Sequence, residues 1–205
     1  MKKILIVGAG AMGAAFSIPL LDNGHSVTLT EPYNFKLLQK LNLKEKIHPS
    51  LNINLPQKLK INKFSSDILN QKWDLIVIAV SSIGIDLIGK NLSKIKNKSP
   101  ILVLTKGLKL DGRNLISMSS LLRKYNKNLN ISVLKGPCLA KELAKKNQTK
   151  VIIANKNINI AKKIGKLIST NYYLVEYSTD IIGVEVCSAV KNIYAMVIGA
   201  GQSLN

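Results

Sequence analysis

The stretch Lys3-Ile4-Leu5-Ile6-Val7-Gly8-Ala9-Gly10-Ala11-Met12-Gly13 decides the fold. Its apolar first half predicts a buried strand, Lys3–Val7, and the residues after it predict a helix, Met12–Asn23. The glycines between them form a G-x-G-x-x-G pattern, in which Gly8 permits a tight turn, Gly10 lets the backbone approach a pyrophosphate, and Gly13 allows close packing of helix and strand. Because the N–H groups of a helix N-terminus attract phosphate, this segment predicts a dinucleotide-binding site.

Short apolar runs alternate with amphipathic stretches along the rest of the chain. This pattern predicts an α/β fold, a Rossmann-type doubly wound, mainly parallel sheet with the first helix of a C-terminal helical domain. We expect a dinucleotide-binding domain at 1–177 and the start of a helical substrate domain at 178–205. The expected strands are Ser26–Thr30, Lys58–Lys63, Asp74–Val80, Ile101–Thr105, Ile131–Leu134, Val151–Ala154 and Tyr172–Val175. The expected helices are Asn34–Lys46, Gly84–Ile95, Asn114–Tyr125, Leu139–Lys146 and Ile160–Ser169, with a loop at Pro49–Pro56.

The strong positive charge does not by itself indicate a nucleic-acid partner. The formal charge of +19 comes from 30 Lys and Arg against 11 Asp and Glu, and two of the 30 are arginine. The lysines are spread along the chain without interleaved aromatic residues, which are 5% of the total. We therefore expect solvated lysines that attract anionic ligands, and no nucleic-acid partner.

Cysteine spacing and hydropathy predict a cytoplasmic protein without a metal site. Cys138 and Cys187 are too far apart for a zinc or redox motif, and reduced thiols are the default in the cytosol. Two lysines followed by the uncharged run Ile4–Leu21 resemble a targeting segment, but three glycines interrupt that run. The apolar stretch Ile181–Ala200 contains a glutamate and a lysine, which are costly in lipid, so we expect no membrane insertion.

Glu31 ends the second predicted strand, 18 residues after Gly13. A carboxylate there accepts hydrogen bonds from the ribose hydroxyls of the adenosine and repels a 2′-phosphate, which favours NAD over NADP. The alternative is a surface glutamate at a strand end, and Lys36 nearby would partly offset the repulsion.

Two lysines are candidates for chemistry. Lys106 follows the apolar strand Ile101–Thr105, at the edge of the sheet where ligands bind in open α/β folds, and a cation there can hold a carbonyl oxygen or a phosphate. Lys191 lies in a run of small apolar residues, Gly183–Ala195, and such surroundings can lower a lysine pKa enough for proton transfer near neutral pH.

The segment Gly136-Pro137-Cys138-Leu139-Ala140-Lys141-Glu142 again joins a strand to a helix. The N–H groups of the first helical turn can meet an anion or the nicotinamide amide. Cys138 has two interpretations: a thiol with a lowered pKa at a helix N-terminus, or a small packing residue, which we favour.

Four segments in this order resemble the motifs of NAD(P)-dependent glycerol-3-phosphate dehydrogenase: Gly8–Gly13, Thr105–Gly107, Gly136–Glu142 and Gly183–Asn192. The resemblance covers essentially the whole chain, and Pro49–Pro56 is similar to the leucine-proline segment of that family. It implies reversible hydride transfer between a nicotinamide, NAD or NADP, and C2 of dihydroxyacetone phosphate, giving sn-glycerol 3-phosphate for glycerophospholipid synthesis.

The resemblance also implies roles for individual residues. Lys191 matches a catalytic lysine that exchanges a proton with the C2 oxygen, and Lys106 matches a lysine that touches both cofactor and substrate. Gly136, Cys138 and Asn192 are assigned to the phosphorylated substrate, and Ala11, Met12, Lys106 and Ala140 match cofactor contacts. Gly8, Gly10, Gly13 and Glu31, taken from the residue pattern itself, complete the expected cofactor site.

Several departures from the family pattern affect these expectations. Cys138 replaces a hydroxyl residue, Ser81 stands where proline is common, and Glu31 stands where many bacterial members have a basic residue. Family members continue beyond the position of Asn205 into a helical substrate domain, so we expect a truncated chain. The apolar faces around Val186, Val190, Ile193 and Val197 would then be exposed, and the chain would bind a dinucleotide without robust turnover.

Two alternative functions stay open. One is another two-domain nicotinamide reductase, of the ketopantoate or β-hydroxyacid type, and the other is a non-catalytic nucleotide-binding module. A homodimer is possible in each case. Neither His25 nor His48 has a carboxylate or nucleophile partner in the sequence, so we expect turn or surface residues, and we expect Trp73 to pack in the core.

Overall fold

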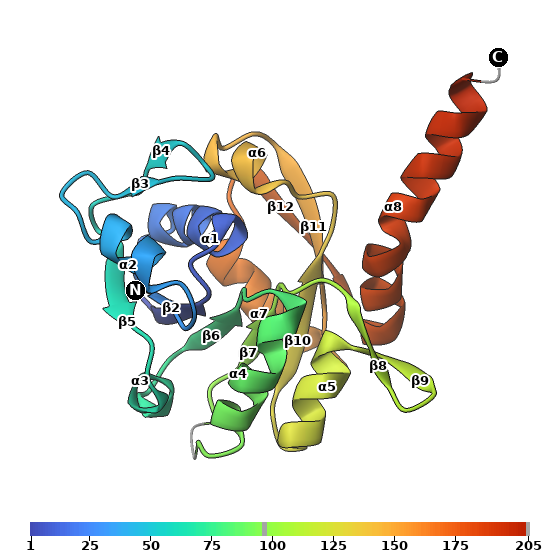
Figure 1. The fold of residues 1–205 in the computed structure, drawn as a ribbon, viewed down its shortest axis with the longest axis horizontal. Helices are drawn as coiled ribbons and strands as arrows, with labels where there is room; N and C mark the ends of the chain where they lie inside the picture. Colours follow the sequence, from blue (N-terminus) through green and yellow to red (C-terminus); the bar gives the residue numbers. More distant parts are fainter. Residues whose placement is uncertain (96–97, 204–205) are drawn as a thin grey trace.

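The computed structural model describes residues 1–95 and 98–203, apart from the side chains of residues 192 and 203. One eight-stranded sheet runs through the molecule, and helices cover both of its faces (Figure 1). Neighbouring strands pair in the order β12-β11-β10-β7-β6-β1-β2-β5, and every pairing is parallel except that of β10 with β11. The prediction of a doubly wound, mainly parallel α/β sheet is confirmed.

The strands of this sheet are β1 (Lys3–Val7), β2 (Ser26–Glu31), β5 (Lys60–Lys63), β6 (Leu75–Ile78), β7 (Ile101–Val103), β10 (Ile131–Lys135), β11 (Thr149–Ala154) and β12 (Tyr173–Ser178). Two hairpins lie outside it, β3 (Ile47–His48) with β4 (Ile53–Asn54), and β8 (Leu108–Asp111) with β9 (Asn114–Ser117). The helices are α1 (Ala11–Asp22), α2 (Phe35–Leu41), α3 (Ser66–Asn70), the 3-10 turn η1 (Ser82–Gly84), α4 (Ile85–Leu92), α5 (Met118–Tyr125), α6 (Ala140–Ala144), α7 (Ile158–Ile168) and α8 (Ile181–Ser203).

The strand order reverses at β1. The chain builds β1, β2 and β5 outward in one direction and then returns to place β6 on the other side of β1. Loops diverge at such a switch point, and the crevice at the carboxyl ends of the strands is where ligands bind in open α/β sheets. The turn after β1, which contains Gly8, Gly10 and Gly13, lies at this crevice.

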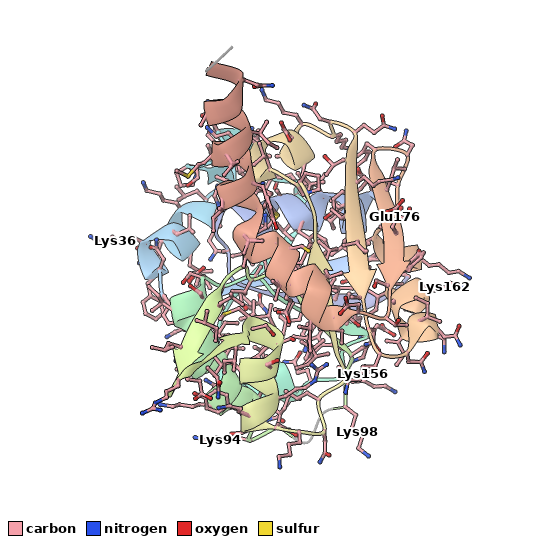
Figure 2. The ribbon with its side chains drawn as sticks, turned by 90° about the vertical axis from the view of Figure 1, so that its right-hand side faces the viewer. Lys36, Lys94, Lys98, Lys156, Lys162 and Glu176 are labelled. Carbon is pink, nitrogen blue, oxygen red and sulfur yellow. The ribbon has the colours of Figure 1, made fainter. Side chains whose placement is uncertain are left out.

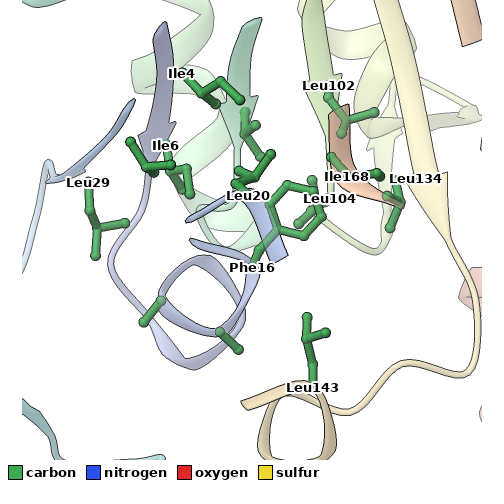
Figure 3. Close-up of a cluster of buried hydrophobic side chains, with 14 of the residues drawn as sticks. Ile4, Ile6, Phe16, Leu20, Leu29, Leu102, Leu104, Leu134, Leu143 and Ile168 are labelled. Carbon is green, nitrogen blue, oxygen red and sulfur yellow. The ribbon is translucent and has the colours of Figure 1, made fainter. Parts of the chain in front are cut away.

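Two apolar clusters hold the helices to the sheet. Helices α1, α6 and α7 cover one face, where Phe16 packs among Leu20, Leu104 and Leu134 (Figure 3). Its ring meets Tyr173 edge-on, with centroids 6.1 Å apart. Helices α3, α4 and α5 cover the other face with a second cluster, which also receives the first residue of α8. Trp73 belongs to that cluster and donates from Nε1 to the carbonyl of Ile68 at 2.7 Å, which confirms its packing role.

The helix expected at Asn114–Tyr125 is wrong in its first part. Residues Leu108–Ser117 form the hairpin β8–β9 instead, and α5 begins at Met118, where the Ser117 hydroxyl caps it. The cause is the Asp-Gly sequence at the turn: Gly112 has a φ of +60°, a conformation that glycine adopts without a steric penalty.

The region after β2 also differs from expectation. The helix expected at Asn34–Lys46 ends at Leu41, and the loop expected at Pro49–Pro56 contributes β4 to a small hairpin. The prediction of a surface position for His48 is wrong, because its side chain is 1% exposed. Its ring hydrogen-bonds the backbone of the glycine turn, a contact between segments that are distant in the sequence.

Helix α8 packs on the sheet only through its first turns and then extends away from the body of the molecule (Figure 1). Asp180 starts it by accepting the N–H of Gly183 at 2.8 Å. Beyond Glu185, the apolar side chains of Val186, Ile193 and Val197 are exposed, as expected, and Val190 is partly buried. The expected domain boundary, between residues 177 and 178, falls at the last residue of β12, shortly before α8, and the division into two domains stays a prediction.

The lysines are distributed around the molecule. Lys36, Lys94, Lys98, Lys156 and Lys162 point outward at separate places on the outline (Figure 2). Within the described residues, no single helix is long and apolar enough to span a membrane, although the two halves of α8 pass that test together as a bent pair.

Candidate functional site

The three glycines of the turn after β1 have different surroundings. Gly8 has a φ of +110°, and a Cβ there would lie 2.7 Å from the carbonyl group of Ala79 at the end of β6. A Cβ on Gly13 would lie 1.9 Å from the Gly8 carbonyl oxygen. Gly10 is different, because no heavy atom lies within 4 Å of its Cβ position. Gly8 and Gly13 are thus needed by the fold, whereas Gly10 leaves open space above the helix N-terminus.

Two buried side chains hold the peptide groups of Ala9 between these glycines. A carboxylate oxygen of Glu31 accepts the Ala9 N–H at 2.7 Å, and Nε2 of His48 lies 3.0 Å from the Ala9 carbonyl oxygen. Because Nδ1 of His48 accepts the Leu51 N–H at 3.3 Å, the ring proton is on Nε2, and this nitrogen donates to Ala9. The conformation of the glycine turn is therefore fixed from both sides.

Glu31 is a buried residue, so the alternative of a surface glutamate is wrong. Its second oxygen accepts the N–H groups of Tyr33 at 2.9 Å and Asn34 at 3.2 Å. Three backbone donors therefore hold the carboxylate at the rim of a cavity of about 340 Å³ that Gly8, Gly10 and Tyr33 also line. Its contact with a ribose stays a prediction.

A second cavity, of about 320 Å³, begins where the first ends, since Ala79 and Val80 line both. Met12, Lys106, Cys138 and Ala140 also line this second cavity, so it brings together residues from three of the four motifs. The Thr105 hydroxyl donates to the Val80 carbonyl at 2.7 Å and fixes the loop that precedes Lys106.

The environment of Lys106 favours its neutral form more than water does. Partial burial lowers its pKa below the ordinary lysine value, repulsion from Lys191 lowers it further, and the thiol group of Cys138 opposes the shift when ionised. Lys106 and Lys191 are far apart in the sequence, and the structure brings them within electrostatic range of each other.

Lys191 lines a third cavity, of about 550 Å³, together with Gly136, Asp180, Cys187 and Ser188. The segment Gly136–Cys138 joins this cavity to the second one. Gly136 has a φ of +148°, and a Cβ there would approach the Lys150 carbonyl oxygen to 2.9 Å, so a side chain is excluded. Lys191 itself is exposed, and the side chain of Asn192 lies outside the described residues.

Cys138 is a packing residue. Its side chain is 5% exposed, it precedes the first turn of α6, and burial raises the pKa of its thiol. The alternative of a reactive thiol with a lowered pKa is therefore wrong. Among the described residues no group of three or more His, Cys, Asp or Glu side chains has the arrangement of a metal site.

Two buried charged residues near the site were missed in the sequence. Lys135 ends β10 directly before Gly136, and Glu185 lies in the first turns of α8; they are 3% and 2% exposed. A lysine at the end of the apolar run Ile131–Leu134 was the available signal, because a cation at the carboxyl edge of a buried strand lies close to the ligand crevice.

Comparison with known proteins identifies the family of the chain. The family model described as NAD-dependent glycerol-3-phosphate dehydrogenase N-terminus matches residues 3–161. A glycerol-3-phosphate dehydrogenase (NAD(P)+) of Fusobacterium nucleatum is 31% identical over 209 residues, which cover 100% of this chain and 61% of that protein. An NADP(+)-dependent glycerol-3-phosphate dehydrogenase of Archaeoglobus fulgidus is 30% identical and is matched over 95% of this chain and 59% of its own length.

The solved structures give the same result. The crystal structure of glycerol-3-phosphate dehydrogenase from Coxiella burnetii superposes with a TM-score of 0.81 at 27% identity, over 100% of this chain and 62% of that one. The chain thus spans about 60% of the length of the relatives it matches. The family model matches most of the chain, and the chain therefore belongs to the NAD-dependent glycerol-3-phosphate dehydrogenase family.

Proposed function

We propose that this chain binds NAD(H) or NADP(H) and contributes to reversible hydride transfer between dihydroxyacetone phosphate and sn-glycerol 3-phosphate. The observation on which this rests is the arrangement of Lys106 and Lys191: Lys106 shares a cavity with Met12 beside the glycine turn, and the segment Gly136–Cys138 joins that cavity to the one that Lys191 lines. The names of the relatives supply the substrate.

The residues at the glycine turn fit a dinucleotide. Gly10 leaves space where a side chain would block a pyrophosphate, and the N-terminus of α1 points its N–H groups toward that space. Met12 and Ala140 line the next cavity, toward Lys106, which we assign to the nicotinamide end. The bound nicotinamide supplies the hydride chemistry.

The two lysines act on the oxygen atoms of the substrate. We assign to Lys191 the proton exchange with the C2 oxygen, and to Lys106 a hydrogen bond to substrate and cofactor. Because the pKa of Lys106 is lowered, its deprotonation at neutral pH costs less free energy than that of an ordinary lysine. Gly136, Cys138 and Asn192 complete the proposed substrate contacts.

The proposed substrate is a small phosphorylated molecule, and the lysine-rich surface attracts such anions. We further propose a cytoplasmic location, which the two free cysteines, one buried and one exposed, support. A homodimer is proposed as well, because the exposed apolar residues of α8 offer a surface for association.

The test is a titration of the 205-residue chain with NADH and NADPH, followed by nicotinamide fluorescence, and then addition of dihydroxyacetone phosphate. Saturable binding with tighter affinity for NADH is expected, and absence of binding to both would refute the cofactor assignment. In a chain extended by the C-terminal part of one of the relatives, consumption of NADH with dihydroxyacetone phosphate, lost in Lys191→Met, is expected. Consumption with a ketopantoate or β-hydroxyacid substrate alone would favour a different reductase, and binding without turnover would favour a nucleotide-binding module.

A further inference from the structure

Lys135 is a buried cation that contacts the loop before Lys106. Its Nζ donates to the carbonyl oxygen of Leu104 at 3.4 Å and also to that of Thr105. These carbonyls lie directly after the neighbouring strand β7, and Lys106 is the next residue. A buried ammonium group needs such acceptors, because an unpaired charge away from water is strongly unfavourable.

The charges that face Lys135 come from two other elements. The pKa of Lys135 is lowered to about 8: burial lowers it most, the Glu185 carboxylate of α8 raises it, and the ammonium group of Lys106 lowers it. At pH 7 the group is therefore mainly charged. Glu185 is fixed in turn, since its carboxylate accepts the N–H of Ser119 at 3.1 Å and also the Ser119 hydroxyl.

This arrangement connects the elements that present both lysines of the site. Lys106 follows directly on the carbonyl groups that Lys135 holds. Lys191 lies on α8 within two turns of Glu185, which attracts Lys135 and anchors the helix to α5. If the attraction between Lys135 and Glu185 served stability alone, an apolar residue of similar volume would be an adequate replacement for Lys135. The two contacts to the Lys106 loop suggest a more specific role.

We propose that Lys135 is a positioning residue for the two-lysine site: it holds the Thr105–Gly107 loop on β10 and maintains a positive charge beside Lys106. The importance of this role for turnover rests on the proposed function, whereas the contact itself does not. Repulsion between two ammonium groups acts on both of them. While Lys135 is charged, it therefore also favours the neutral form of Lys106.

The test measures the reactivity of Lys106 directly. The 205-residue chain and its Lys135→Met and Lys135→Arg variants are exposed briefly to acetic anhydride at pH 7, and peptide mass spectrometry gives the acetylation of Lys106 relative to exposed Lys162 on α7. Only a neutral amine reacts, so a rise in the pKa of Lys106 slows its acetylation, and a reduction of about threefold is readily measured. We expect about that reduction in Lys135→Met and a rate near that of the unsubstituted chain in Lys135→Arg, which keeps the charge. An unchanged ratio in Lys135→Met would overturn the proposal.

A second measurement needs no substitution and therefore does not depend on the folding of a variant. Lys135 in the unsubstituted chain should be acetylated at least about tenfold more slowly than Lys162, because its amine is buried and hydrogen-bonded, although its lowered pKa alone would make it faster. Equal rates would contradict the contacts on which the proposal depends.

The NADH titration of the unsubstituted chain separates this proposal from the proposed function. Absence of NADH binding, together with the expected change at Lys106, would refute the function and leave the positioning role intact. Saturable NADH binding with an unchanged Lys106 ratio would refute the positioning role alone.

Discussion

Substituting alanine for Gly10 and for Gly13 separates ligand binding from folding within one turn. A Cβ at position 13 would lie 1.9 Å from the Gly8 carbonyl oxygen, whereas real Cβ atoms essentially never approach another heavy atom closer than 3.0 Å. Helix α1 and the glycine turn must therefore separate by roughly 1 Å. Because the contact is with backbone, we expect the upper end of the cost of overpacking, about 3 kcal/mol.

Gly10→Ala should leave the stability nearly unchanged. No heavy atom lies within 4 Å of the added methyl group, and the φ of −62° is allowed for alanine. Alanine reduces the freedom of the unfolded chain, which stabilises by roughly 0.4–1 kcal/mol, but it is a poorer helix N-cap than glycine. The methyl group occupies the space proposed for the pyrophosphate, so we expect the NADH Kd to rise at least about tenfold, or about 1.4 kcal/mol.

Thermal unfolding followed by circular dichroism and NADH titration by fluorescence test both variants. At roughly 2–4 °C per kcal/mol for a chain of this size, Gly13→Ala should lower the Tm by about 6–12 °C, and Gly10→Ala should change it little. Unchanged NADH affinity in Gly10→Ala would refute the placement of the pyrophosphate. An unchanged Tm in Gly13→Ala would refute the packing argument.

Two further substitutions test contacts at opposite ends of the strands, His48 at the carboxyl end of β1 and Asp74 at its amino end. His48→Leu removes the donor to Ala9 and the acceptor for Leu51. Urea unfolding should therefore show a free energy of unfolding lower by about 2 kcal/mol, and NADH titration should show a weaker affinity. His48→Gln should restore part of both the stability and the affinity, and identical values for the two variants would contradict the assigned hydrogen bonds. Asp74→Asn tests pH dependence, because the Lys3 N–H and then the Lys2 ammonium group hold the pKa of Asp74 below 3.8. A carboxyl group whose pKa is lowered in the folded state stabilises the protein above pH 3.8, and this stabilisation is lost as the pH falls. The difference in Tm between the unsubstituted chain and Asp74→Asn should therefore be present at pH 7 and disappear toward pH 2. An equal difference at both pH values would refute this assignment.

The sequence was informative where local pattern determines structure. The apolar run Lys3–Val7 and the glycines after it predicted β1, the turn and α1, because strand periodicity and glycine placement are properties of neighbouring residues. The failure at Asn114–Tyr125 has a local cause as well. Four residues of a hairpin strand precede a genuine helix there, and the Asp-Gly turn before them was not recognised.

The polar residues that were missed have a different cause. His48, Glu185 and Lys135 are each defined by a partner far away in the sequence: Ala9, Ser119 and Thr105. The apolar run before Lys135 was a local signal, but no neighbouring residue identifies these partners, and a lysine or histidine is exposed in most proteins. Only the assembled sheet brings these pairs together.

These long-range contacts share one location, the carboxyl edge of the sheet. Glu31 and His48 hold Ala9, the Thr105 hydroxyl holds Val80, and Lys135 holds the carbonyl of Thr105. Each joins one ligand-facing loop to another segment through a buried polar group, and a buried polar group that loses its partner destabilises the state that contains it. These hydrogen bonds fix the glycine turn to Glu31 and His48, and the Lys106 loop to Val80 and Lys135, whereas the apolar clusters hold the helices to the sheet. Substitutions at these contacts should consequently alter cofactor affinity and lysine reactivity more than substitutions of equal destabilisation in the apolar core.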